Sequence, residues 1–286
     1  MKLNFTKMHG TGNDFIVIDG FRYKIKNYRQ LAIDLCKRHF GIGGDGLIII
    51  LPPESKENDF RMRIFNADGS EAEMCGNGIR CFSHYLREKN LTGKDILRVE
   101  TLAGIITPEV ISGNRKTSQI RVNMGKPKFK PAEIPVDLDT DAEYIQEHKL
   151  PVNDKTFQIN CVSMGNPHTI IFREDIDQIP LAEWGKEIEN HPAFPEKTNV
   201  EFIRIIDRSE IAMRVWERGS GITLACGTGA SASVVAGIKN NYLDEKVVVH
   251  LPGGDLVIEW SGDDVFMTGP AETVFNGAIE IEEGLV

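Results

Sequence analysis

The sequence predicts an α+β fold of two pseudo-symmetric halves, each a curved, mostly antiparallel sheet wrapped around a central helix, with a cleft between them. Cys75–Ile79, which reads CGNGI, is matched by Cys226–Ala230, which reads CGTGA, 151 positions later. Gly12–Ile18 has a similar counterpart in Gly165–Ile171, 153 positions later. Two matches at nearly one offset indicate an internal duplication. Many short strands with two helices in each half favour α+β over a doubly wound sheet.

The first half carries two predicted helices. One runs from about Tyr28 to His39 and has its apolar residues at helical spacing. The other follows the first Cys-Gly motif and stops near Gly93. Strands are predicted near residues 3–8, 14–19, 46–51, 59–65, 96–101, 104–111 and 118–124.

The second half repeats that order. Its helices are predicted near 181–190 and from the second Cys-Gly motif to about Asn240, with three strands after the latter. The strands before it are predicted near residues 156–163, 168–173, 198–206 and 210–216. Proline-rich Lys126–Pro131 and the acidic stretch after it predict a connector between the halves.

Composition limits the function. The chain has 286 residues and a formal net charge of -9 without a basic stripe, which argues against a nucleic-acid partner. The N-terminus lacks a secretory signal, and the longest aliphatic run, Leu47–Leu51, is too short to span a bilayer, so we expect a cytoplasmic protein with no membrane partner. Five cysteines, an odd number at low density, argue against a disulfide framework.

The two matched cysteines indicate chemistry. A lone cysteine is most often a small buried apolar residue, but the duplicated setting favours a reactive pair. Helix starts lower the pKa of a thiol from its free value of about 8.5, and two close thiols titrate as a coupled pair, one thiolate beside one thiol. Backbone amides at the helix starts can hold a carboxylate. These amides belong to Gly76, Asn77, Gly227 and Thr228.

Paired thiols related by pseudo-twofold symmetry suit inversion at carbon, because one group removes a proton and its twin returns one to the opposite face. We therefore expect a racemase or epimerase with its active site in the cleft. The other cysteines are assigned to packing, and no Cys or His set completes a tetrahedral zinc site. They are Cys36, Cys81 and Cys161. The glycine-rich Gly41–Gly46 follows a helix and precedes a strand, which is the wrong order for a dinucleotide site.

Further polar residues stand at equivalent points of the two halves. Asn66 lies nine residues before Cys75, and Glu217 lies nine before Cys226. Arg218 beside Glu217 matches an amino-acid head group, with Arg for the carboxylate and Glu for the ammonium, although a surface ion pair is the plainer alternative. Asn13 and Asn166 are also at equivalent positions. Each could be a turn or capping residue, but their equivalence favours side chains that line the same cleft.

With these residues assembled, the chain resembles the diaminopimelate epimerases over essentially its full length. The motifs that carry the resemblance are Lys7–Phe15, Phe65–Ser70, Cys75–Gly78, Gly165–His168, Thr198–Glu201, Glu217–Gly219 and Ala225–Gly229.

The resemblance implies conversion of LL-2,6-diaminopimelate to the meso isomer, for lysine and peptidoglycan synthesis, without a cofactor. It implies that Cys75 and Cys226 are the acid/base thiols, that His168 and Glu217 tune them, and that the four helix-start amides hold the reacting carboxylate. It also implies that the chain end returns to the first half, giving halves of 1–124 with 273–286 and 125–272. The side chains that would read the distal end are Asn13, Asn66, Asn166, Asn199, Glu217 and Arg218.

One departure and several alternatives remain. Gly46 stands where some family members carry a ligand-contacting glutamine, so no side-chain contact is expected there. A racemase of another amino acid, such as proline or hydroxyproline, a thiol redox protein and a binding module with a dead site are the competing hypotheses. The Cys-x-x-Cys motif that thiol redox proteins usually carry is absent from the sequence. Pyridoxal phosphate has no lysine or phosphate motif in its favour. Exposed sheet edges permit a homodimer but do not demand one.

Overall fold

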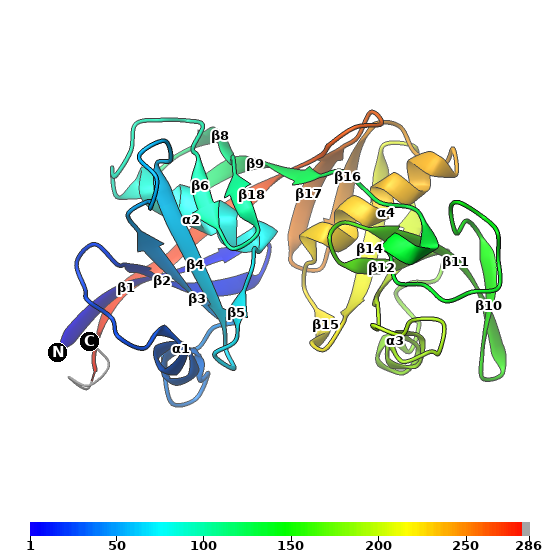
Figure 1. The fold of residues 1–286 in the computed structure, drawn as a ribbon, viewed down its shortest axis with the longest axis horizontal. Helices are drawn as coiled ribbons and strands as arrows, with labels where there is room; N and C mark the ends of the chain where they lie inside the picture. Colours follow the sequence, from blue (N-terminus) through cyan, green and yellow to red (C-terminus); the bar gives the residue numbers. More distant parts are fainter. Residues whose placement is uncertain (282–286) are drawn as a thin grey trace. The chain divides into compact units, whose positions relative to one another are not determined.

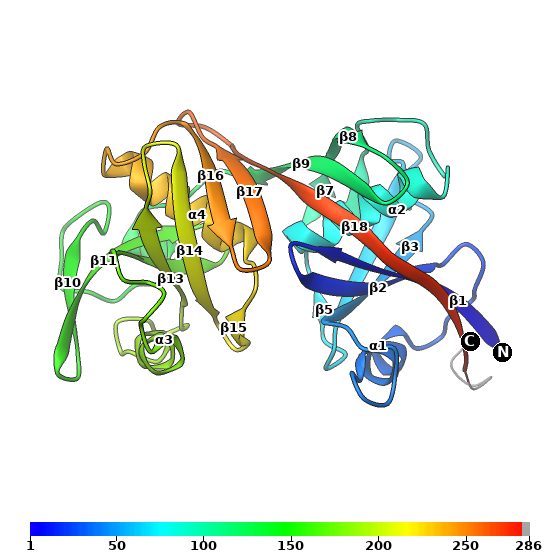
Figure 2. The ribbon, with the colours of Figure 1, turned by 180° about the vertical axis from the view of Figure 1, so that it is seen from behind.

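The computed structural model describes residues 1–281, and the chain divides into two compact units. Unit 1 comprises Met1–Asn123 with the chain from Thr268 on, and unit 2 comprises Met124–Met267. The chain passes from one unit to the other inside strand β9 (Thr117–Gly125) and again inside β18 (Val265–Glu280), as Figures 1 and 2 show. The resemblance assigns the segment 273–286 to the first half, and residues 282–286 of it lie outside the described residues.

Unit 1 contains helices α1 (Tyr28–Cys36) and α2 (Gly76–Glu88). Its strands, besides β9 and β18, are β1 (Lys2–Gly10), β2 (Asn13–Asp19), β3 (Gly46–Leu51), β4 (Phe60–Asn66), β5 (Glu71–Ala72), β6 (Val99–Thr101), β7 (Gly104–Ile106) and β8 (Glu109–Gly113).

Unit 2 contains helices α3 (Leu181–Glu189) and α4 (Gly227–Lys239) and a short 3-10 turn, η1 (Pro131–Glu133). Its strands are β10 (His148–Val152), β11 (Lys155–Ser163), β12 (Pro167–Phe172), β13 (Asn199–Ile205), β14 (Glu210–Glu217), β15 (Gly221–Thr223), β16 (Lys246–Leu251) and β17 (Gly254–Glu259).

The two units pair their strands in the same way, which confirms the predicted duplication. In unit 1, β2 runs parallel to β3 and β4 runs parallel to β6, while β1–β2 and β3–β4 are antiparallel. In unit 2, β12–β13 and β14–β16 are parallel, while β11–β12 and β13–β14 are antiparallel. Antiparallel pairs predominate in both, so the predicted α+β class with mostly antiparallel sheets is correct.

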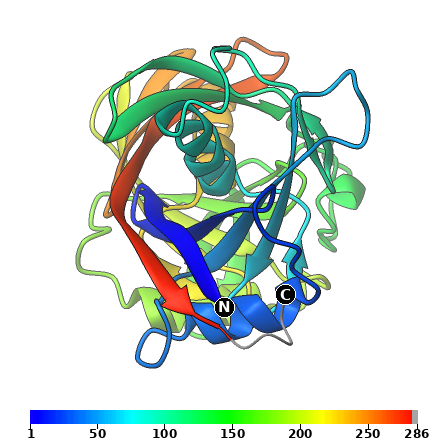
Figure 3. The ribbon, with the colours of Figure 1, turned by 90° about the vertical axis from the view of Figure 1, so that its left-hand side faces the viewer.

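Each unit places one helix inside its curved sheet and one outside it. Helix α2 packs on β1 to β4, and Figure 3 shows it running within the strands of unit 1. Helix α4 packs on β11, β12, β13 and β17. The outer helix of unit 1, α1, contacts β3 and β4. The outer helix of unit 2, α3, contacts β13, β14 and β15. A helix rich in glycine, alanine and serine suits the inner place of α4, because small side chains let strands approach from several sides.

The structure differs from the sequence-based expectation in several element bounds. Helix α1 ends at Cys36 instead of His39, because the amides of Ile42 and Gly43 turn back to the carbonyl of Leu35 and close the helix end. The strand expected at 104–111 is split into β7 and β8 around Pro108, which has no N–H for a ladder. Strands β5, β10 and β15 were not predicted. Among residues 1–281, no helix combines the length and the apolar character needed to cross a membrane.

Candidate active site

Both matched cysteines cap inner helices, as predicted. Cys75 is the N-cap of α2 at φ -140° and ψ 122°, and its Sγ accepts the Gly78 amide at 3.4 Å. Cys226 is the N-cap of α4 at φ -130° and ψ 112°, and its Sγ accepts the Gly229 amide at 3.4 Å. The preceding amides of each first turn have no intrahelical acceptor. Each unit therefore offers a sulfur atom and amide donors at one helix start.

In unit 1 the Asn13 side chain is oriented toward Cys75. Asn13 Nδ2 donates to Asp45 Oδ2 at 2.8 Å, and a carboxylate can only accept, so the amide oxygen must point the other way. Asn13 Oδ1 lies 3.8 Å from Cys75 Sγ and accepts a hydrogen bond from Asn77 Nδ2 at 3.1 Å. The thiol of Cys75 thus has an acceptor for its proton.

Asp45 is itself held by charged neighbours. Arg38 Nη2 contacts Asp45 Oδ1 at 2.6 Å and Asp14 Oδ1 at 2.9 Å, and Lys7 Nζ contacts Asp14 Oδ2 at 2.6 Å. Burial opposes ionisation of the Asp14 carboxyl, but the hydrogen bonds from Arg38 and Lys7 together outweigh it and lower its pKa to about 2. The charged network fixes the strand end that carries Asn13.

Asn66 is placed differently from Asn13. It is exposed at the end of β4, and its Nδ2 donates to Ser70 Oγ at 2.9 Å. In the strand ladder Asn66 lies opposite Gly46, and Gly46 lies opposite Phe15 on β2. Asn66 therefore shares a sheet end with Asn13.

Asn77 Oδ1 is buried without a hydrogen-bond partner among the described residues. Unit 1 therefore leaves one amide oxygen near the thiol unsatisfied.

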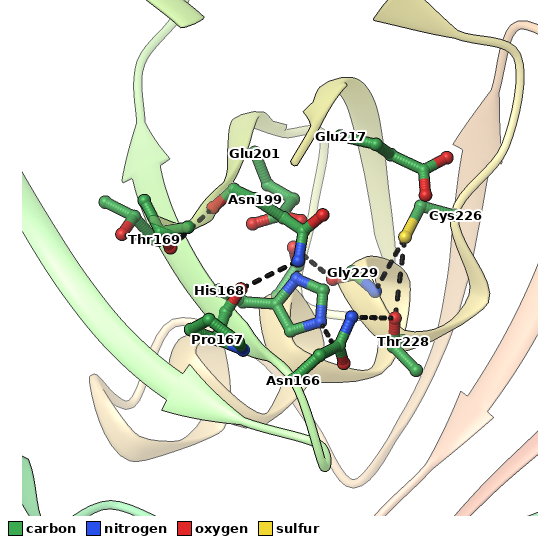
Figure 4. A network of polar contacts seen from close by, with 12 residues as sticks. Asn166, Pro167, His168, Thr169, Asn199, Glu201, Glu217, Cys226, Thr228 and Gly229 are labelled. Atoms are coloured by element: carbon green, nitrogen blue, oxygen red, sulfur yellow. Dashed lines mark hydrogen bonds and ion pairs between the residues drawn. The ribbon is translucent and has the colours of Figure 1, made fainter. Parts of the chain in front are cut away.

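In unit 2 a chain of hydrogen bonds leads to Cys226 (Figure 4). Cys226 Sγ lies 3.5 Å from Thr228 Oγ1, which accepts from Asn166 Nδ2 at 3.3 Å. Asn166 Oδ1 lies 3.0 Å from His168 Nε2, and His168 Nδ1 lies 2.7 Å from Glu201 Oε1. His168 reaches the thiol through two intervening side chains within its own unit.

Glu217 lies at the end of β14 beside Cys226. Burial raises the pKa of the Glu217 carboxyl, although hydrogen bonds from Thr223 and from the Cys226 thiol act in the opposite direction. The expectation that the helix start lowers the thiol pKa was wrong for Cys226. Burial, followed by the negative charges of Glu217 and Glu201, raises the pKa of that thiol well above its ordinary value, and the Thr228 and Gly229 donors offset this only in part. Burial and the neighbouring acidic side chains therefore favour the thiol form of Cys226.

Asn199 and Arg218 are joined to each other. Asn199 Nδ2 donates to the Pro167 carbonyl at 2.8 Å, and its Oδ1 accepts the Arg218 amide at 2.9 Å. Both ends of the Asn199 side chain are thus bonded within unit 2. Arg218 is exposed and donates one guanidinium hydrogen bond, to the Glu196 carbonyl at 2.9 Å. Among residues 1–281, the other donors of this guanidinium have no hydrogen-bond partner.

Two residues of the site were missed by sequence reasoning. Asp45 orients Asn13, and the fully buried Glu201 bonds His168. The sequence does carry a signal for Glu201, because this residue stands two positions after Asn199 on the same strand face, between the apolar Val200 and Phe202.

The remaining cysteines are buried, and burial raises the pKa of Cys36 to about 11 and those of Cys81 and Cys161 to about 12. No group of three or more His, Cys, Asp or Glu side chains that could hold a metal ion occurs in the described part of the chain.

Comparison with known proteins identifies the family. The sequence profile described as diaminopimelate epimerase matches residues 5–130 and 160–274. The chain belongs to the diaminopimelate epimerase family. It is 67% identical over 284 residues to the diaminopimelate epimerase of Halothermothrix orenii, covering 99% of this chain and 100% of that protein. The corresponding protein of Pelotomaculum thermopropionicum is 50% identical over 278 residues, covering 96% and 98%.

Solved structures share the fold of this epimerase family at low sequence identity. A phenazine biosynthesis protein of the PhzF family from Bacillus anthracis superimposes with a TM-score of 0.70 at 19% identity, covering 98% of this chain and 100% of that one. A hydroxyproline epimerase from Agrobacterium vitis, solved with trans-4-hydroxy-L-proline, gives 0.71 at 14% identity, covering 99% and 94%.

Proposed function

We propose that this protein converts LL-2,6-diaminopimelate to meso-diaminopimelate, with Cys75 and Cys226 as the two acid/base groups. The observation that carries the proposal is that each half of a duplicated chain caps its inner helix with a cysteine, in a chain 67% identical to a curated diaminopimelate epimerase. One thiol would take the α proton, and the other would return a proton to the opposite face of the carbon.

The surroundings of Cys226 suit a base. Glu217 accepts the thiol hydrogen bond and can take its proton. The sulfur left behind would accept the Gly229 amide and the Thr228 hydroxyl, which stabilise a thiolate. The raised pKa of the thiol makes that thiolate a strong base once formed, as removal of a weakly acidic α proton requires.

The surroundings of Cys75 suit an acid. Its sulfur accepts the Gly78 amide, as that of Cys226 accepts the Gly229 amide, but the side chain that it faces within unit 1 is the amide oxygen of Asn13, which accepts a hydrogen bond and carries no charge. This neighbour favours the thiol over the thiolate. We assign Cys75 as the proton donor when Cys226 removes the α proton, and the roles exchange in the reverse direction.

The substrate carboxylate next to the reacting carbon is assigned to the helix starts, through the amides of Gly76, Asn77, Gly227 and Thr228. These donors face negative charge that grows as the carbanion forms, and in such sites one lost donor costs about 100- to 1,000-fold in rate. For the distal amino-acid end we assign the guanidinium of Arg218, together with polar side chains from both units. These are Asn13, Asn66, Asn166, Asn199 and Glu217.

An epimerase of a cyclic amino acid is the second candidate, because the fold of a hydroxyproline epimerase superimposes over 99% of this chain. Arg218 favours a substrate with a second charged end, since an exposed guanidinium with unused donors suits a distal carboxylate. Proline and hydroxyproline offer no such group.

The test is proton NMR of LL-diaminopimelate in deuterated buffer with reduced, metal-free protein. We expect deuterium at the α position together with formation of meso product, and loss of product formation in Cys75→Ala and in Cys226→Ala. Phe40→Ser, which changes a side chain that is 91% exposed, is the matched surface control.

Exchange with proline or hydroxyproline but not with diaminopimelate would replace the substrate and keep the two-thiol mechanism. Exchange that survives both cysteine substitutions would refute the mechanism.

A further inference from the structure

Glu201 is a carboxylate in an unusual place. Its side chain has no exposed surface, and its Oε2 has no hydrogen-bond partner among the described residues. It stands on β13, where the opposite sheet face carries the apolar side chains Val200 and Phe202 in the unit core. Burying a carboxylate is costly unless it is paired. Among the described residues, the side chain paired with Glu201 is His168, which is equally buried. Because burying the Glu201 carboxylate costs free energy, packing alone does not explain a glutamate at this position.

The partners of His168 decide where its protons lie. Nε2 faces the amide oxygen of Asn166 at 3.0 Å, and an oxygen can only accept, so Nε2 carries a hydrogen. Nδ1 faces Glu201 Oε1 at 2.7 Å, so one proton lies between these two atoms. Whichever of the two atoms holds it, the pair is neutral overall and Nε2–H is retained. Neutrality fits complete burial.

The hydrogen on Nε2 sets the direction of every later bond. Because Asn166 Oδ1 accepts from His168, its Nδ2 is directed at Thr228 Oγ1 at 3.3 Å and donates to it. Thr228 Oγ1 then keeps its own hydrogen for Cys226 Sγ at 3.5 Å. The chain ends in a hydroxyl that donates to sulfur, and this donor favours a thiolate there.

Without Glu201 the direction is no longer fixed. A neutral imidazole can carry its proton on Nδ1, and Nε2 then accepts. The Asn166 amide would turn over, its oxygen would accept from Thr228, and Thr228 would accept from the Cys226 thiol. That reversed chain favours the protonated thiol and opposes its role as a base.

We infer that Glu201 is a positioning residue, which holds the Nδ1 side of His168 and thereby orients a hydrogen-bond chain through Asn166 and Thr228 that ends as a donor on Cys226 Sγ. The inference rests on the proposed role of Cys226 as an acid/base group. The other titratable groups that face this pair are Cys161 from β11, Glu217 from β14 and Cys226 from α4.

The direct test is NMR of the full-length protein with ¹⁵N-labelled histidine, reduced and without substrate. We expect His168 to show a protonated Nε2 and a strongly downfield proton at Nδ1, both absent from the spectrum of His168→Gln. His84, which is buried in unit 1 and bonded to Ser118, is the internal reference. A bare Nε2 on His168 would overturn the inference, and this result does not depend on any catalytic activity.

The functional test is Glu201→Gln, which keeps the shape and removes the charge. We expect the downfield Nδ1 proton to disappear and kcat to fall about 10-fold or more, a loss similar to that caused by removing the outer hydrogen-bond partners of metal ligands. KM should change little. Glu210→Gln is the matched control, because it removes the carboxylate paired with His250 at 3.2 Å at the opposite end of β14 from Glu217. Its kcat should stay at the wild-type value.

Thermal melting separates a folding defect from a catalytic one. A folded Glu201→Gln protein with wild-type kcat and an unchanged His168 spectrum would refute the inference. If this variant does not fold, the inference is tested by the protonation of His168 Nε2 and Nδ1 in the wild-type spectrum. A wild-type protein that shows the expected histidine spectrum but does not act on diaminopimelate would contradict the proposed function and leave the orientation of the chain standing.

Discussion

Glu201 fills the space that a side chain at Gly229 would need. A Cβ atom at Gly229 would lie 2.6 Å from Glu201 Oε1 and 3.2 Å from Cys226 Sγ. Gly229 is the third residue of α4, and its amide donates to the same sulfur. The absent side chain therefore lets one helix turn contact both the thiol and the buried carboxylate.

This relationship predicts that Gly229→Ala is harmful. Alanine in place of glycine inside a helix ordinarily stabilises it by about 0.5–1 kcal/mol. Here we expect the clash with Glu201 to outweigh that gain, with a net loss of about 1–3 kcal/mol in the free energy of unfolding and a fall in kcat. Urea unfolding and the deuterium-exchange assay measure the two effects.

Gly93→Ala is the control for this substitution, because a Cβ there would have no neighbour within 4 Å. A Gly229→Ala protein as stable and as active as the Gly93→Ala protein would show that the carboxylate can move aside.

Local patterns explain how much of the fold the sequence predicts. The repeated Cys-Gly motif marks both inner helices, because an N-cap residue followed by glycine is a short-range signal. Strand β3 is predicted at its observed bounds, Gly46–Leu51, since a continuous apolar run is equally local. Strands β5 and β15 span two and three residues, too few to show a period.

The contacts that build the candidate site are not local. Asp45, just before β3, contacts Asn13, which lies 32 residues earlier in the chain. Glu201 on β13 contacts His168 on the neighbouring strand β12, which lies 33 residues earlier. The sequence also could not predict that the pKa of the Cys226 thiol is raised. Burial in the folded unit outweighs the local effect of the helix start, which acts to lower that pKa. The site roles taken from the family resemblance remain predictions for the experiments above.

Glu217→Gln should make Cys226 ionise more easily while slowing catalysis. Burial is the largest cause of the raised thiol pKa, and the negative charge of Glu217 is the next. Removing that charge lowers the thiol pKa, so in a Cys75→Ala background the pH midpoint of iodoacetamide alkylation should move to lower pH. In the protein with both thiols kcat should fall, because the group that accepts the thiol proton is gone.

Glu210→Gln in the same Cys75→Ala background should leave the alkylation midpoint in place. A midpoint that rises in Glu217→Gln would mean that the carboxyl is protonated at neutral pH and stabilises the thiolate by donating to it.

Asp45→Ala should weaken substrate binding more than turnover. Asp45 orients the Asn13 amide without touching the thiol, so its loss frees the amide to rotate. One hydrogen bond contributes about 0.5–1.5 kcal/mol, which corresponds to a rise of about 2- to 10-fold in KM. Asp34→Ala, which removes an exposed i,i+3 pair with Lys37, should leave KM unchanged. A fall in kcat with no rise in KM would mean that Asn13 acts on the Cys75 thiol and does not bind the substrate.

Asp14→Asn should destabilise the protein near neutral pH, and its effect should shrink in acid. The folded-state pKa of Asp14 is lowered from 3.8 to about 2, so its stabilising contribution is complete above about pH 4 and is lost as the pH falls through 2. The substitution also leaves Lys7, whose side chain is 9% exposed, without its carboxylate partner. We expect a loss of about 1–3 kcal/mol at pH 7 in urea unfolding, allowing for solvent screening.

Asp139→Asn, at an exposed aspartate of the connector, should match the wild type at every pH. The two explanations for an Asp14 effect separate by pH. A difference from the wild type that narrows between pH 4 and pH 2 reports the ionised carboxyl and its contacts with Lys7 and Arg38. A difference that stays constant over this range would come instead from the shape of the β2 end, and the charged network would then have no measurable part in holding Asn13 in place.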